Sequence, residues 1–360
     1  MGEPLPYPSM KRGSKKQSPS SRPRRGRSPS GHHPPPSIGL ALGSGSARGW
    51  CHIGILQELT ARGIEPAIVS GCSMGALVGA AYVTGNLDAL EDWARGLRRT
   101  RFLRLLDLRV PGGGLVQGGR LLEELGEFIP DVSIESLEMP FAAVATDLAT
   151  GREVWLREGS LLEAVRASIA VPGLFTPHDT GGTWLVDGGL VNPVPVSLCR
   201  ALGAQIVVGV NPFGDRVSRF TPQPRFTSPG GEMDGVENEA LPRGAAEGGK
   251  TSPKGSGMQP LRLRANRLLG QLAARGTRGP GMMEVLVQSL NIMQDRLIRS
   301  RMAGDPPEVL LSPRLGHIAL LDFDQAAAAI AEGKATVRRT AGALDEALGR
   351  RGKEDGQPPE

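Results

Sequence analysis

Short apolar runs alternate with helix-like stretches through residues 38–84. Residues 38–42 and 67–70 are short and apolar, which is typical of buried strands. Residues 47–61 repeat apolar side chains at helical spacing, residues 74–84 are rich in small side chains, and a glycine follows each stretch. This order predicts two parallel strands, each followed by a helix.

The rest of the chain continues to mix the two kinds of element. Further strands are predicted at 141–146, 152–155, 183–186, 205–211 and 308–311. Further helices are predicted at 89–99, 120–128, 160–170, 282–301 and 323–348. The pattern therefore indicates an α/β fold class.

Composition divides the chain into five parts. Residues 1–36 are rich in Pro, Ser and Arg, and residues 213–280 are dense in Gly, Pro, Ser and charge. Both lack apolar periodicity, which predicts a disordered tail and a flexible insertion. We expect a catalytic domain over 37–212, a helical part over 281–348 that packs on it, and a loose tail over 349–360.

The positive net charge belongs to the tail. Of the 42 Lys and Arg residues, eight fall within 1–36 against one acid, which leaves 34 basic and 36 acidic residues for the remainder. The folded part is therefore close to neutral, and only the tail has a composition that can contact an anionic surface. No specific nucleic-acid partner is predicted, and no oligomeric state is assigned.

Cysteine usage and the absence of long apolar runs bear on the compartment. Cys51, Cys72 and Cys199 form neither a disulfide framework nor a paired metal motif. The first residues lack the apolar run of a secretory signal, and no window reaches the ~20 apolar residues of a spanning helix. These features predict a cytoplasmic protein, with peripheral contact of the tail at the inner membrane surface left open.

The sequence Gly71-Cys72-Ser73-Met74-Gly75 lies between a predicted strand and a predicted helix. A GxSxG in that context is typical of a nucleophile elbow, in which small neighbours allow a tight turn that projects the serine hydroxyl. The helix N-terminus then stabilises developing negative charge. We interpret Ser73 as a nucleophile; the other reading is a tight turn with an inert serine.

A second glycine-rich turn, GSGSARG at 43–49, joins the first strand to its helix. Its GxGxxxG spacing departs from the dinucleotide fingerprint, and the GK[ST] of a phosphate-binding loop is absent. Parallel strands end at the same sheet edge, so this turn should lie beside Ser73. We favour an oxyanion hole built from backbone N–H groups around Gly45 over a nucleotide site.

No histidine has a convincing context as a base for Ser73. His52 is typical of a packed helix residue, His178 is the one triad candidate, and His317 lies in a distant loop. Asp187 ends a predicted strand and is followed by two glycines that permit close approach. Desolvation beside Ser73 could raise its pKa into a useful range. From the residues alone, a base and an ordinary Asp-Gly turn remain equal alternatives.

Three stretches in this order, LALGSGSARGWCHIGIL, SGCSMG and VDGGLVNPVP, resemble the patatin-like phospholipases. The GDPPEVLL tract and the serine-containing loop are most similar to the bacterial RssA-like and NTE-type acyl hydrolases. The resemblance covers 38–205 and extends weakly to 350. It implies a three-layer α/β/α sandwich around a mainly parallel sheet, and a Ser–Asp dyad in place of a triad.

The resemblance also implies roles for individual residues. Ser73 would be the nucleophile, Asp187 its base, and Arg48 would orient the oxyanion loop. The family loop is more commonly GGGxRG, so two serines here replace glycines, a change that keeps the backbone donors. The loop donors would be Gly43, Ser44, Gly45 and Ser46. The motif glycines would be Gly71, Gly75, Gly188 and Gly189.

The function implied is hydrolysis of lipid acyl esters, with phospholipid or lysophospholipid as substrate and without metal or organic cofactor. Met74, Leu77, Val78, Leu174 and Phe175 are candidates for an acyl groove. Two rival hypotheses remain: a regulatory or interaction protein on the same fold with weak or no catalysis, and a nucleotide-binding protein indifferent to loss of Ser73.

Overall fold

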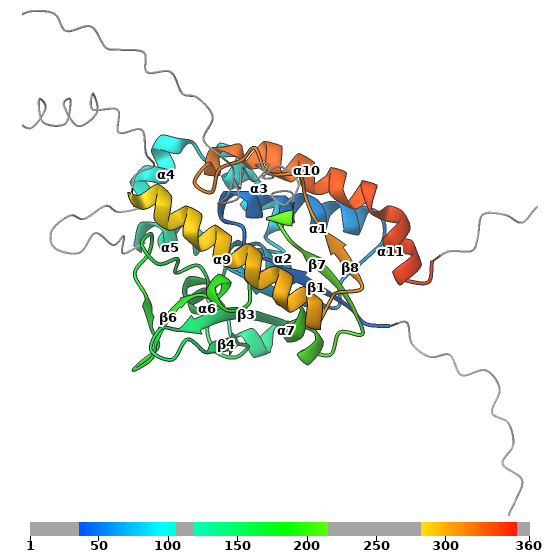
Figure 1. The fold of residues 1–360 in the computed structure, drawn as a ribbon, viewed down its shortest axis with the longest axis horizontal. Helices are drawn as coiled ribbons and strands as arrows, with labels where there is room; N and C mark the ends of the chain where they lie inside the picture. Colours follow the sequence, from blue (N-terminus) through cyan, green and yellow to red (C-terminus); the bar gives the residue numbers. More distant parts are fainter. Residues whose placement is uncertain (1–35, 106–118, 215–281, 351–360) are drawn as a thin grey trace, which may run out of the picture. The chain divides into compact units, whose positions relative to one another are not determined.

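The computed structural model describes residues 36–105, 119–214 and 282–350 (Figure 1). The strands are β1 Ile38–Leu42, β2 Ile68–Cys72, β3 Phe141–Asp147, β4 Glu153–Leu156, β5 His178–Asp179, β6 Trp184–Asp187, β7 Ile206–Val210 and β8 Val309–Leu311. The α-helices are α1 Cys51–Ala61, α2 Met74–Val83, α3 Leu87–Gly96, α4 Arg99–Leu105, α5 Gly119–Leu125, α6 Leu161–Ser168, α7 Val196–Ala201, α9 Met282–Gly304, α10 Ala326–Arg339 and α11 Ala341–Ala347. Short 3₁₀ turns are η1 Ser46–Trp50, η2 Ile134–Ser136, η3 Gly188–Leu190 and η5 Phe323–Gln325.

The eight strands form one sheet with the order β5-β6-β3-β2-β1-β7-β8, and β4 pairs with β3 beside this path. Five neighbouring strands, β3, β2, β1, β7 and β8, run parallel to one another, as the βαβ pattern predicted. The remaining strands, β4, β5 and β6, run antiparallel to their neighbours. The sheet is thus mainly parallel, and its antiparallel part carries the predicted base.

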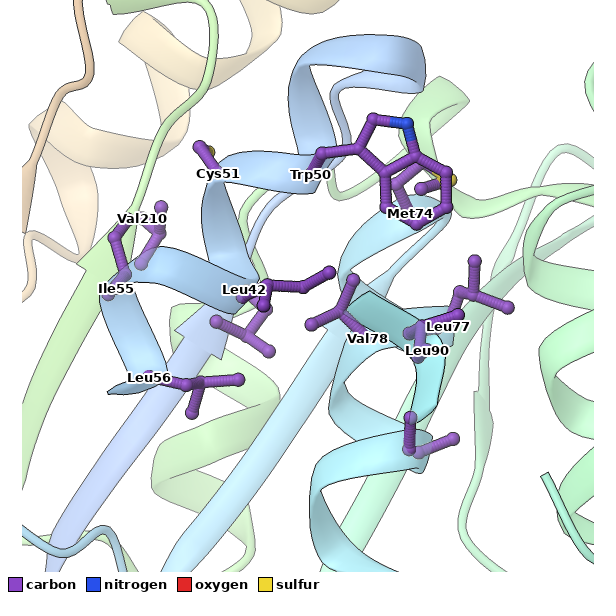
Figure 2. Packing of buried hydrophobic residues seen from close by; sticks show 14 of the residues in the cluster. Leu42, Trp50, Cys51, Ile55, Leu56, Met74, Leu77, Val78, Leu90 and Val210 are labelled. Carbon is purple, nitrogen blue, oxygen red and sulfur yellow. The ribbon is translucent and has the colours of Figure 1, made fainter. Parts of the chain in front are cut away.

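Alternate residues of β1 face two different layers. Leu42 packs with Ile55 of α1 and Val78 of α2 in the largest apolar cluster, around which Figure 2 is centred. Ala41 belongs to the opposite face, where it shares a cluster with Val196 of α7 and Ile298 of α9. Helices therefore cover both faces of the sheet, and the predicted α/β/α sandwich is confirmed (Figure 1). Both faces bury apolar side chains because parallel strands require cover on each side.

The helices α1 and α10 cross at two glycines. A Cβ on Gly54 of α1 would overlap the carbonyl oxygen of Ile330, and a Cβ on Gly333 of α10 would overlap that of Cys51. The contact brings a helix that follows the glycine-rich turn against a helix near the end of the described chain. The contact between α1 and α10 therefore helps to fix the position of the glycine-rich turn at 43–49.

We expect Gly54→Ala to lower the free energy of unfolding by about 1–3 kcal/mol, because the added methyl forces the two backbones apart. Gly342 provides a matched control, since it lies inside α11 and a Cβ there would meet nothing within 4 Å. Gly342→Ala should raise stability by about 0.5–1 kcal/mol through helix propensity. Urea unfolding of both variants measures the difference. Equal effects in the two variants would contradict the close crossing.

Most predicted elements occur within two or three residues of their expected bounds, and several differences are informative. The strand expected at 183–186 extends to Asp187, which therefore belongs to β6. The helix expected at 323–348 is divided into η5, α10 and α11. The short elements α4, α7 and β5 were not predicted.

The predicted tail over 1–36, the insertion over 213–280 and the end over 349–360 lie outside the described residues except at their margins. Within the described part of the chain, no helix combines the length and the apolar character needed to cross a membrane.

Candidate active site

Ser73 occupies a strained turn between β2 and α2. Its backbone has φ 53° and ψ −121°, in the left-handed range that is rare for a residue with a side chain. The glycines on either side allow this turn: a Cβ on Gly71 would meet the backbone of Ala76, and one on Gly75 would overlap the carbonyl of Leu42. The GxSxG motif therefore has the strand–turn–helix geometry of an elbow.

Sheet register brings Asp187 to the same place. Cys72 of β2 pairs with Val144 of β3, and the next residue of β3, Ala145, pairs with Asp187 of β6. Thr146 fixes this antiparallel pairing further by donating its hydroxyl to the backbone carbonyl of Asp187 at 2.8 Å. Ser73 and Asp187 consequently meet across β3, although they are more than a hundred positions apart in sequence.

The carboxyl of Asp187 is buried and only partly satisfied. Oδ1 accepts the N–H of Gly189 at 2.7 Å. Among the described residues, no group meets the distance and angle limits of a hydrogen bond to Oδ2. Burial raises the pKa of this carboxyl to about 6, and hydrogen bonding from Ser73 and from Gly189 opposes the rise. The carboxyl is thus poised to take up a proton near neutral pH.

Both glycines after Asp187 have close neighbours, and at Gly188 the neighbour is backbone that leaves no room for a side chain. A Cβ on Gly188 would overlap the carbonyl of Val144, and one on Gly189 would overlap the side-chain amide of Gln294 from α9. Gln294 was not singled out by the sequence. Gln294 lies on α9, and its position beside Gly189 places α9 at the edge of the site.

The glycine-rich turn uses some of its N–H groups for its own structure. Gly43 donates to the carbonyl of Val210 at 3.1 Å, and Ser44 donates to that of Pro193 at 2.7 Å. The N–H groups of Gly45 and Ser46 have no acceptor among the described residues. Of the four N–H groups from Gly43 to Ser46, these two are therefore not used by the turn's own structure.

Ser46 and Arg48 connect the turn to the C-terminal part of the described chain. Ser46 has φ 48°, and its hydroxyl donates to the carbonyl of Leu320 at 2.6 Å. Arg48 is fully buried, donates Nε to the carbonyl of Ile318 at 2.8 Å, and places its guanidinium 5.7 Å from the ring centre of Phe213. Arg48 thus links the turn to the segment around Ile318.

Two of the described histidines, His52 and His178, make contacts away from Ser73. His52 is buried, its Nε2 lies 2.7 Å from the carbonyl oxygen of Gly43, and desolvation lowers its pKa to about 4. It is therefore neutral and donates to the turn. His178 lies 3.1 Å from Glu163, with a pKa lowered mainly by desolvation, and His317 is exposed. Within the described ranges, no hydrogen bond joins an imidazole to Ser73 or Asp187.

Ser73 opens into an apolar pocket. Apart from Ser46 and Ser73, every described residue that lines it is apolar or aromatic. The lining residues are Ser46, Trp50, Ser73, Met74, Leu77, Trp93, Leu97, Phe102, Leu121, Leu125, Ile169, Val171, Leu174, Phe175 and Phe323.

The aromatic wall of this pocket was missed at the sequence level. Four of the five groove candidates line the pocket, whereas Val78 packs in the core. Trp50 contacts Trp93 and Phe323 edge to face at 6.0 and 6.2 Å, and Phe102 stacks on Phe323 at 4.2 Å. Aromatic residues make up only 4% of the chain, and those that form the wall are far apart in sequence. Their meeting in one pocket therefore leaves no pattern along the sequence.

No three His, Cys, Asp or Glu side chains in the described ranges come together as metal ligands could. A serine on a strained elbow beside a buried carboxylate, in an α/β/α sandwich, is the arrangement of a serine-hydrolase class of site.

Residues 40–200 match the family model of the patatin-like phospholipases. The match spans less than half of the chain and confirms the resemblance of the three motifs to that family.

Three relatives illustrate the range of similarity. An uncharacterised NTE family protein of Mycobacterium tuberculosis is 41% identical over 176 residues, which are 49% of each chain. Neuropathy target esterase sws of Drosophila melanogaster is 34% identical over 182 residues, and patatin-like phospholipase domain-containing protein 6 of Mus musculus is 32% identical over 183 residues. Each covers 49% of this chain, and the match spans 13% of those two proteins. The aligned part is thus about half the length of the mycobacterial relative and a small part of the animal ones.

Proposed function

We propose that this protein hydrolyses lipid acyl esters, of the phospholipid or lysophospholipid class, through a dyad of Ser73 and Asp187. The observation that carries the proposal is the meeting of a strained, buried serine with a buried carboxyl of raised pKa. Both are only 2–3% exposed, and the serine opens into the apolar pocket. Such perturbed groups cluster at functional sites.

In the proposed first step, Ser73 Oγ attacks the ester carbonyl carbon while its proton passes to the Asp187 carboxylate. The negative oxygen is stabilised by the N–H groups of Gly45 and Ser46 and by the N-terminus of α2. Collapse expels the alcohol, which takes the proton from Asp187 and leaves an acyl-Ser73 ester. Water then gives a proton to Asp187 and attacks the acyl carbon. As the bond from that carbon to Ser73 Oγ breaks, Asp187 returns the proton to Oγ, which releases the fatty acid and restores Ser73.

The pocket supports a lipid as the substrate. An acyl chain that lies along Leu77, Leu174 and Phe175 would remove its methylene groups from water, which is worth about 0.8 kcal/mol for each CH₂. Longer chains should therefore lower KM until the pocket is filled. The domain's relatives include a protein named an esterase, and this likeness supports ester chemistry for the present chain.

The test is release of fatty acid from p-nitrophenyl acetate, octanoate and palmitate and from lysophosphatidylcholine, with fluorophosphonate labelling in parallel. We expect turnover that favours the longer acyl groups, and labelling at Ser73. A folded protein that neither releases acid nor reacts with the probe would contradict the proposal. That outcome would favour the regulatory or interaction protein on the same fold.

The dyad also predicts a pH dependence. Asp187 works as a base only when it is ionised, and burial raises its pKa to about 6. We therefore expect kcat/KM to fall about tenfold for each pH unit below that value and to level off above it. Initial rates on one ester across the range, with far-UV circular dichroism to show that the fold persists, measure this. A rate insensitive to acid would argue against a carboxylate base.

A further inference from the structure

Ser168, the last residue of α6, holds the backbone of the predicted nucleophile. Its hydroxyl oxygen accepts the N–H of Ser73 at 2.9 Å, and the same hydroxyl donates to the carbonyl of Val144 at 2.7 Å. Ser168 is fully buried. A side chain thus joins the β2–α2 turn to β3 at the point where the turn departs from regular strand pairing.

The same segment also holds the predicted base. Two residues after Ser168, the carbonyl of Ala170 accepts the N–H of Asp187 at 2.9 Å. The end of α6 therefore bonds to the backbone of both members of the dyad. No other described segment makes hydrogen bonds to the backbone N–H groups of both residues.

A strained turn needs such an external hold. The positive φ of Ser73 costs on the order of 1–3 kcal/mol and persists only where its surroundings over-determine it. The bond from the Ser73 N–H sets the plane of the peptide between Cys72 and Ser73, and with it the direction of Oγ. Without the acceptor, the peptide can rotate and the hydroxyl loses its aim at Asp187.

We propose that Ser168 is a positioning residue for Ser73, an inference that rests on the proposed hydrolase function. Ser168 acts through the Ser73 backbone and has no proton to exchange with substrate, because its hydroxyl hydrogen is donated to Val144. Its neighbour Ile169 lines the pocket, so the end of α6 combines substrate contact with control of the elbow.

The test compares Ser168→Ala with Ser70→Ala. Ser70 is also fully buried and donates to a backbone carbonyl, that of Pro195 at 3.0 Å, and it makes no bond to the Ser73 N–H. We expect Ser168→Ala to lower kcat on a p-nitrophenyl ester by about 10- to 100-fold, with KM and the apparent pKa of the pH profile unchanged. Ser70→Ala should keep kcat at comparable loss of stability, measured by urea unfolding.

Two further readouts separate positioning from general destabilisation. Hydrogen–deuterium exchange of residues 70–77 should become faster in Ser168→Ala and stay as in wild type in Ser70→Ala. Ser168→Thr retains the hydroxyl and should recover kcat. Rates are normalised to the folded fraction, so partial unfolding of a variant does not imitate the effect.

The outcomes distinguish this proposal from the function on which it rests. An active wild type whose kcat survives Ser168→Ala would overturn the positioning role alone. Equal losses in Ser168→Ala and Ser70→Ala would overturn it as well. A wild type without turnover or fluorophosphonate reaction would overturn the hydrolase function together with the positioning role.

Discussion

Replacement of Ser73 by alanine is expected to lower kcat for ester hydrolysis by on the order of 10⁴-fold or more, because it removes the atom that forms the acyl intermediate. The fold should survive. Alanine keeps the N–H that bonds to Ser168, and it bears the same positive φ as serine. Fluorophosphonate labelling of the chain should disappear together with turnover.

The measurement is fatty-acid release under single-turnover and steady-state conditions, with urea unfolding of each variant. Ser70→Ala serves as the matched serine control, since its hydroxyl lies against Pro195. Substantial turnover by Ser73→Ala would mean that another nucleophile performs the reaction, and the proposed dyad would then be wrong.

Asp187→Asn should lower kcat by about 10²- to 10⁴-fold, since the amide cannot accept the Ser73 proton. The Asn oxygen can still accept the Gly189 N–H that Oδ1 accepts now, so the local structure should persist. Loss of rate would then reflect loss of the base alone.

The same change should stabilise the protein above neutral pH. The pKa of Asp187 is raised in the folded state to about 6, so the native protein binds more protons than the unfolded chain between about pH 4 and pH 6. Wild-type stability therefore falls as pH rises through that window. Asp187→Asn removes this cost and should gain up to about 3 kcal/mol at pH 8.

Asp147→Asn is a suitable control for both effects. Its Oδ1 also accepts an N–H two residues ahead, that of Ala149 at 2.9 Å, and hydrogen bonds with Thr150 and Ala149 lower its pKa. Its substitution should leave turnover unchanged, and any loss of stability should appear above the pKa. If Asp187→Asn retained activity, a base role for Asp187 would be untenable, and a loss of stability at pH 8 would contradict the raised pKa of its carboxyl.

Local sequence predicted the elbow because its causes are local. Gly71 and Gly75 lie within two residues of Ser73. Gly71 leaves room for the backbone of Ala76 in the following helix, and Gly75 leaves room for the carbonyl of Leu42 in the neighbouring strand β1. The strand at 38–42 was confirmed at its predicted bounds for the same reason, since a short apolar run between turns leaves few other conformations.

The choice between a base and a turn at Asp187 could not be made from neighbouring residues. It depends on β6 running antiparallel beside β3, which places the carboxyl next to Ser73 and removes it from water. The pKa near 6 follows from that burial, so it exists only in the folded chain.

The sequence by itself determined the α/β order of elements, the serine elbow and the glycine-rich turn, because periodicity and small residues act over a few positions. The tertiary structure decided which N–H groups of the turn remain available, since Gly43 and Ser44 donate to segments far along the chain. It also decided the aromatic pocket wall and the hold of Ser168 on Ser73. These features depend on contacts between residues tens to hundreds of positions apart, and no local pattern records which distant side chains will meet.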